Sequence, residues 1–202
     1  MIAALPLVAA LCLAGPPGHG SPPGDPATVA GRTADAWAAE VDDPNRVVRN
    51  RAVLSLRAFG ADAAPHLADA LRNEDEAVRF WAAEGLGMTP KAPAAKGSLV
   101  VLRTMAKDGA TGERLAAAFA VAALGEADVG VPVLIEGLKH PSRGVAVTSA
   151  DFLARLGKAA APAADALRDA ASNHDDYHVR YRSNQALKAA TGQALSTAEV
   201  MK

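Results

Sequence analysis

The sequence DEAVRFWAAEGLG at residues 75–87 is the clearest copy of a unit that is present five times in the chain. Arg79 serves as the anchor of this copy. The anchors of the other copies align at spacings of 30, 35, 32 and 34 residues, and they are Arg49, Arg114, Ala146 and Arg180. A unit that recurs at this interval is typical of a repeat protein.

The third residue after each anchor is small, and the seventh is aliphatic. These positions hold Ala52, Ala82, Ala117, Ser149 and Ser183, and then Leu56, Leu86, Val121, Leu153 and Leu187. On a helix the two positions share one face, so the small residue lets a neighbouring backbone approach and the aliphatic residue closes the contact. The unit is therefore predicted to be a helix that packs against its own copies.

A second apolar stretch with helical spacing separates consecutive copies, for example at residues 63–71 and 131–138. Thr33 is expected to cap an opening helix that buries Trp37. No stretch alternates with a period of two for long enough to suggest a sheet. The sequence thus predicts an all-α fold, an α-α superhelix of about five antiparallel helix pairs over residues 33–192. Residues 193–202 are expected to form a C-terminal tail.

The motif Pro-x-Leu-x-x-x-Leu, an acidic turn and then Val-Arg-x-x-Ala-x-x-x-Leu runs through residues 65–86. It resembles HEAT repeats, in particular the short kind known from bilin (PBS) lyases. The resemblance covers about residues 34–192 and implies a right-handed, armadillo-like solenoid.

A looser similarity links residues 78–86, 131–140 and 177–182 to the helical-repeat tails of some secreted bacterial sulfatases. The catalytic signature of those enzymes, Cys or Ser followed by x-Pro-x-Arg, is missing.

The composition limits the classes of protein to consider. Half of the residues are hydrophobic but only 4% are aromatic, so the core is expected to consist of Ala, Leu and Val. The formal net charge of −1, with no cluster of Lys and Arg, argues against a nucleic-acid partner.

The N-terminal residues form two segments. The apolar start of the chain predicts a signal peptide at residues 1–20, with a disordered N-terminus as the alternative. The stretch GPPGHGSPPGDP opens a Gly/Pro-rich linker at residues 15–32. A periplasmic or secreted location follows, with no membrane span in the mature chain. Because Cys12 lies in the predicted signal peptide, the processed protein would lack a thiol.

The resemblance to HEAT repeats implies a ladder of ion pairs between anchor arginines and aspartates in neighbouring turns. The ladder residues are Arg49, Arg79, Arg114 and Arg180, with Asp75 and Asp176. Their expected role is structural, since such pairs hold the register of the stack.

The resemblance also implies that the anchored helices line the concave side of the solenoid. Residues one, two and five positions after an anchor should then point away from the core. Leu115, Phe119 and Asp151 stand at such positions and are expected to face outward. Tyr, Trp and Arg are the residue types that anchor protein interfaces. The expected partner-binding residues are Arg51, Phe80, Trp81, Glu84, Tyr181, Arg182 and Gln185. For Phe80, Trp81 and Phe119, the alternative is that they fill gaps between helices.

No motif for nucleophilic catalysis or phosphate binding is present. The sequence HDDYH at residues 174–178 carries metal-binding residue types, but a capped turn explains it better, so no metal and no cofactor are predicted. The predicted function is a non-catalytic, monomeric scaffold or accessory module that binds another protein, such as a secreted hydrolase of the sulfatase type. The alternative is a bilin-lyase-like or other enzyme-associated protein that handles a small-molecule ligand, which a cleft with converging titratable groups would favour.

Overall fold

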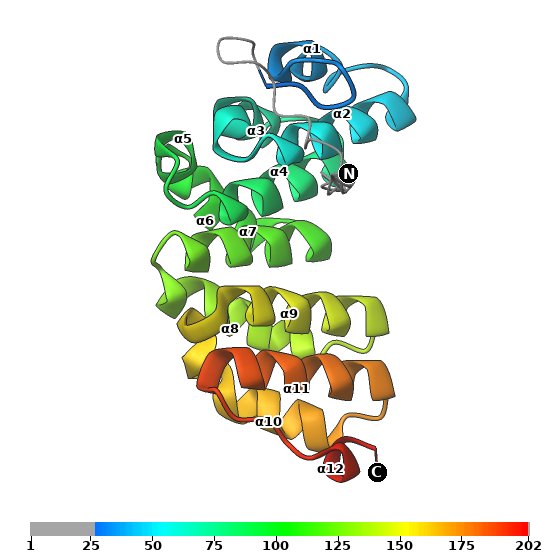
Figure 1. Cartoon of the computed structure of the whole chain (residues 1–202), viewed down its shortest axis with the longest axis vertical. Helices are drawn as coiled ribbons and strands as arrows, with labels where there is room; N and C mark the ends of the chain where they lie inside the picture. Colours follow the sequence, from blue (N-terminus) through cyan, green and yellow to red (C-terminus); the bar gives the residue numbers. More distant parts are fainter. Residues whose placement is uncertain (1–26, 202) are drawn as a thin grey trace, which may run out of the picture.

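The computed structural model describes residues 27–201, which form helices stacked one upon another along a single direction (Figure 1). The predicted signal peptide and residues 15–26 of the predicted linker lie outside the described residues. Within the described chain the only β-type pairing is an isolated bridge between Val29 and Arg32. The predicted all-α solenoid is confirmed.

The five anchored helices form one row, which we call the B row. Its members are α2 (Arg46–Ala58), α4 (Glu76–Met88), α7 (Thr111–Ala123), α9 (Arg143–Leu156) and α11 (Tyr177–Thr191). The helices that precede them form the A row: α1 (Ala34–Ala38), α3 (Ala64–Ala70), α6 (Leu99–Asp108), α8 (Ala127–Leu138) and α10 (Ala164–Asn173). Short helices join or end these elements: η1 (Gly60–Ala63), α5 (Pro93–Gly97), η2 (Gly157–Ala163) and α12 (Thr197–Val200).

The core follows the repeat pattern of the sequence. All five small residues at the third position after the anchor are fully buried, and the five aliphatic residues at the seventh position are at most 1% exposed. Side-chain caps fix the start of several helices: Thr33 accepts a hydrogen bond from the amide of Ala36, and Asp75 accepts one from Ala77. Local sequence thus sets both the faces of the helices and their boundaries.

Glycine allows close packing of α8 against its neighbours. A Cβ atom at Gly130 would overlap the carbonyl oxygen of Ala118 and would lie 2.9 Å from the Cβ of Ala122, both on α7. Gly130 is fully inside α8, where alanine would otherwise be the better helix former. This glycine therefore serves close packing and not backbone freedom.

Replacing Gly130 with alanine should destabilise the protein by about 1–3 kcal/mol, because the added methyl group forces α8 away from α7. The matched control is Gly112→Ala in α7, where the nearest atom to a new Cβ lies 3.7 Å away. That variant should be neutral or slightly more stable. Urea unfolding of both variants tests the packing, and a Gly130→Ala protein as stable as the wild type would contradict it.

Both ends of the solenoid are covered by chain that the sequence assigned to a linker and a tail. Residues 27–32 fold against α1, where the Arg32 guanidinium lies 4.0 Å from the centre of the Trp37 ring. At the other end, α12 buries Val200 to 4% exposure, and Val200 accepts a hydrogen bond of 2.8 Å from Arg180. These segments shield the apolar faces of the terminal repeats, which a solenoid requires.

Among residues 27–201, no helix combines the length and apolar character that crossing a bilayer demands.

Candidate functional site

Anchor arginines close the turn between the two helices of a repeat. Nη1 of Arg79 donates to the carbonyl oxygens of Asn73 and Glu74, at 2.7 and 2.8 Å. Arg49 and Arg180 make the same pair of bonds, each to the carbonyl oxygens of the residues five and six positions earlier in the chain. Carbonyl groups that no helix can pair are thereby satisfied by one planar guanidinium.

The same arginines reach the next repeat, but their partners differ from the predicted aspartates. Arg49 pairs with Asp75 at 2.6 Å, as the ladder requires. Arg79 instead pairs with the buried carboxylate of Glu113 on α7. The last two anchors also depart from the pattern: Arg114 reaches Glu136 at 3.3 Å, and Arg180 donates to the backbone of Val200.

Asp176 acts at the start of α11. Its carboxylate accepts hydrogen bonds from the amides of His178 and Val179, and Nε of Arg143 lies 3.6 Å away. The fourth copy has Ala146 at the anchor position, so Arg143 is the cation that this repeat offers to its neighbour. The amide of Asp176 in turn donates to Nδ1 of His174, which makes residues 174–178 a capped turn.

The environment of Asp75 favours its charged form. The hydrogen bond from Arg49 holds the pKa of the Asp75 carboxyl below its usual value, against the opposing effect of burial, and the bond from the Ala77 amide adds to the lowering. Because the pKa is lower in the folded state than in the unfolded state, the ion pair stabilises the protein above the unfolded pKa of about 4. That stability is lost as the pH falls through the folded pKa.

Asp75→Asn keeps a residue that can cap α4 but removes the charge. At pH 7 the variant should be less stable than the wild type by about 1 kcal/mol, because the bond to Arg49 is no longer charge-assisted. The difference should shrink as the pH falls below the unfolded pKa of about 4, and it should disappear once the pH is below the folded pKa, where the wild-type carboxyl is protonated. Urea unfolding across this pH range is the measurement, and a difference that does not change with pH would contradict the assignment.

Arg79→Ala should destabilise the protein by about 3 kcal/mol, because it leaves the buried charge of Glu113 without its cation and two turn carbonyls without a donor. Arg103 on α6 supplies a matched control, since it forms an ion pair with Glu126 on the surface. The melting temperature of Arg103→Ala should be close to that of the wild type. Thermal unfolding decides, and an unchanged melting temperature for Arg79→Ala would disprove the structural role.

The B row is exposed at both ends. On α11, the side chain of Tyr181 is 44% exposed and its ring centre lies 6.2 Å from that of Tyr177. Arg182 is 3.5 Å from Asp151 of α9, and Gln185 is exposed one turn further along. At the other end, on α2, Arg51 is exposed and pairs with Glu40 at 3.2 Å. These four predicted partner-binding residues, Arg51, Tyr181, Arg182 and Gln185, all lie on the surface.

The middle of the B row is filled, and the expectation that Glu84 points to solvent is wrong. Glu84 is 5% exposed, and its carboxylate pairs with Arg57 of α2 at 2.7 Å and with Arg155 of α9. Leu115 and Phe119, also expected to face outward, are 4% and 3% exposed. The reason is that nearly half of the residues of α7 are alanine, so side chains of α4 and α9 meet across it.

Aromatic rings surround this pair of arginines. Phe119 stacks on Phe152 with ring centres 4.8 Å apart, and Arg155 lies 4.8 Å from the centre of Phe119. Arg57 lies 4.6 Å from the centre of the Trp81 ring. We call Arg57, Trp81, Glu84, Phe119, Phe152 and Arg155 the inner cluster. Phe119 therefore fills a gap between helices, whereas Phe80 and Trp81 are half-buried.

Burial lowers the pKa of Arg57 below its usual value, and the charge of Arg155 adds to this effect, while Glu84 opposes it.

Neither Arg57 nor Arg155 occupies a position that the repeat pattern marked as outward-facing. Their approach to Glu84 depends on how three helices stack, so no local signal in the sequence could have identified them.

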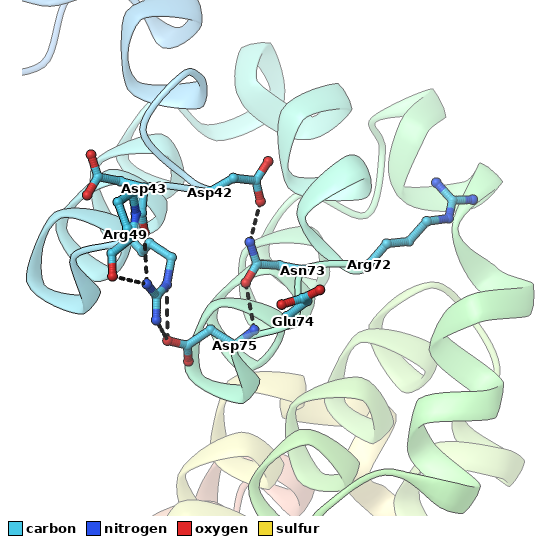
Figure 2. A pocket seen from close by; sticks show the side chains of 8 residues that line it. Asp42, Asp43, Arg49, Arg72, Asn73, Glu74 and Asp75 are labelled. Carbon is cyan, nitrogen blue, oxygen red and sulfur yellow. Dashed lines mark hydrogen bonds and ion pairs between the residues drawn. The ribbon is translucent and has the colours of Figure 1, made fainter.

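A second polar site lies at the turns of the first two repeats. A cleft of about 520 Å³ is lined there by Asp42, Asp43, Pro44, Arg49, Arg72, Asn73, Glu74 and Asp75. Figure 2 shows that Asn73 bridges the two turns, since it donates to Asp42 and accepts from the amide of Asp75 at 2.7 Å. Arg72 points away from these bonds. The side chains of Asp42, Arg49, Asn73 and Asp75 thus hold the two turns together.

No group of three His, Cys, Asp or Glu side chains within residues 27–201 could hold a metal ion.

The fold and its surface define a class: an α-solenoid repeat protein with a well-packed centre and exposed polar and aromatic ends. The sequence pattern of HEAT repeats matches residues 34–118 and 98–188, which together span most of the chain. The chain belongs to the HEAT-repeat family. No curated protein sequence gives a significant match.

The fold is shared by solved structures that match with TM-scores above 0.5. An engineered protein is 19% identical, with a TM-score of 0.53 over 79% of each chain. A designed armadillo repeat protein, solved in complex with the peptide (KR)4, is 18% identical, with a TM-score of 0.51 over 77% of this chain and 81% of that one. The CpcE–CpcF complex of phycocyanin lyase from Nostoc sp. PCC7120 is 18% identical, with a TM-score of 0.49 over 83% of this chain and 78% of that one. At these identities the likeness to the engineered protein and to the designed armadillo repeat protein concerns the fold alone.

Proposed function

We propose that the chain is a non-catalytic protein-binding scaffold or accessory module, and that its partner contacts the exposed ends of the B row. One observation carries the proposal: α11 presents Tyr177, Tyr181, Arg182 and Gln185 on its surface although the adjoining helices are well packed. Tyrosine and arginine are enriched among the residues that dominate binding energy in protein interfaces.

The geometry of α11 suits recognition. Its buried side is fixed by Val179, Ala186 and Leu187, which are at most 1% exposed, so the opposite side is held rigidly. A tyrosine on a rigid helix offers a large contact area and loses little side-chain entropy on binding. The exposed side of α11 is therefore preorganised for a partner.

The other end of the B row adds an apolar surface. On α2, Val47 is 74% exposed and Leu54 is 40% exposed, and both line a shallow cleft of about 550 Å³ that also contains Arg51. Apolar side chains exposed on one face of a helix favour contact with another protein. This surface supports the proposal independently of α11.

The proposal includes export to the periplasm or beyond, action as a monomer, and a secreted hydrolase such as a sulfatase as the partner. The apolar segment at residues 1–20 supports export, and the looser similarity to sulfatase tails suggests the kind of partner. Fractionation of the source cells tests the location, and protein found only in the cytoplasm would refute export.

The full-length chain, with an affinity tag at its C-terminus, should capture one protein in near-equal amount from its own cells after cross-linking. The double variant Tyr181→Ala, Arg182→Ala should lose that protein, because both side chains lie on the exposed side of α11. The matched control is Arg103→Ala, Arg168→Ala on the A row, whose side chains are about half exposed. It should capture the partner normally.

Capture that does not depend on Tyr181 and Arg182 would reject the α11 surface. If no protein is captured while a small molecule co-purifies with the chain, the alternative of a ligand-handling, bilin-lyase-like protein replaces the scaffold.

A further inference from the structure

The inner cluster contains two cations and one anion. Arg57 comes from α2, Glu84 from α4 and Arg155 from α9, and Arg155 is 71 residues away from Glu84 in sequence. Both guanidinium groups approach the same carboxylate, so its single negative charge cannot neutralise them both. The cluster therefore carries a net charge of +1 in a largely buried setting, which attracts an anion.

Much of the hydrogen-bonding capacity of these arginines is unused. Among the described residues, Arg155 donates one side-chain hydrogen bond, from Nη1 to Glu84. Its side chain remains 34% exposed. Nε of Arg57 is buried and has no partner within residues 27–201. A guanidinium has five N–H groups, and its Nε and Nη2 edge fits the two oxygens of a carboxylate. Arg155 can bind such a group without releasing Glu84.

Arg155 also lines a cleft on the B row. This cleft has a volume of about 470 Å³, and its other lining residues are Gly87, Met88, Pro90, Phe119, Ala123, Leu156 and Ala159. Arg155 is thus the one charged residue in an otherwise apolar lining. A volume of this order accommodates a small organic group or one or two side chains. The matching ligand has an apolar body and a single negative charge.

We propose that this cleft binds an acidic side chain and an adjacent apolar side chain on a peptide segment of the partner protein. The carboxylate pairs with Arg155, and the apolar side chain lies against Phe119 and Met88. The assignment rests on the proposed function, because it gives the chemistry of the partner segment. It makes Arg155 a binding residue that the repeat pattern did not reveal.

Charge decides between a carboxylate and a phosphate. A doubly charged phosphate would face the carboxylate of Glu84 within the same cluster, and the repulsion between them would oppose binding. A singly charged carboxylate matches the net charge of the inner cluster. The apolar lining further favours an acid that is attached to an apolar group.

The test uses two synthetic peptides that differ by one residue, acetyl-Ala-Glu-Phe-Leu-Ala-amide and its Gln analogue. Each is added to the full-length protein labelled with ¹⁵N, and the Nε–H signal of Arg155 is followed by NMR. The Glu peptide should give saturable shifts, whereas the Gln peptide should bind at least tenfold more weakly, because it lacks the charge. The signal of the indole N–H of Trp37 on α1, which donates a hydrogen bond to the carbonyl oxygen of Val29, should not move.

Variants separate the site from the fold. Arg155→Met removes the guanidinium but keeps an unbranched apolar stem, and it leaves Glu84 paired with Arg57. The protein should therefore fold but no longer bind the Glu peptide. Binding to this variant is measured by the NMR signal of the Trp81 indole N–H. Arg103→Met on α6 is the control and should bind normally. Equal shifts with both peptides, no saturable shift at millimolar concentrations, or unchanged binding by Arg155→Met would each overturn the proposal.

A free organic acid is the remaining source of the same chemistry. If 3-phenylpropionate binds and the Glu peptide does not, the peptide assignment is wrong. The two proposals fail separately: a captured partner that depends on Tyr181 but not on Arg155 rejects only the cleft. Binding of the Glu peptide without any captured protein rejects only the scaffold.

Discussion

The stacking of this protein depends on how a guanidinium group satisfies two repeats at once. One nitrogen of Arg79 takes up the carbonyl oxygens of its own turn, while Nε of the same residue reaches Glu113 in the next repeat. Each repeat touches mainly its neighbours, so the register of the whole solenoid is the sum of such local settings. The arginine is suited to this role because its five donors are fixed in one plane.

The inner cluster adds a longer connection to this local scheme. Glu84 joins α2, α4 and α9, and thus spans repeats that are not adjacent. The alanines of α7 make this contact feasible, since larger side chains there would keep Arg155 away from Glu84. The same contact fills the centre of the B row except for the cleft beside Arg155, and the two ends of the row are exposed. Small residues in one helix therefore decide which side chains meet at the centre of the row.

The sequence predicted the residues of the helices better than it predicted the residues of the surface. Ala82 and Leu86 are buried as their spacing requires, and Thr33 and Asp75 cap helices as their residue types suggest. These features depend on residues within one or two helical turns. Glu84 fulfils the same local rule for an outward position and is nevertheless buried, because its surroundings come from two other helices.

The sequence by itself determined the class of fold, the number of helix pairs and the face that each helix buries, because these follow from the spacing of small and aliphatic residues along a helix. Only the tertiary structure decided which arginine meets which carboxylate, and that residues 27–32 and α12 cover the ends of the stack. The physical reason is distance in sequence: Arg155 and Glu84 meet across 71 residues. Their approach depends on small rotations between successive repeats, which no local pattern encodes.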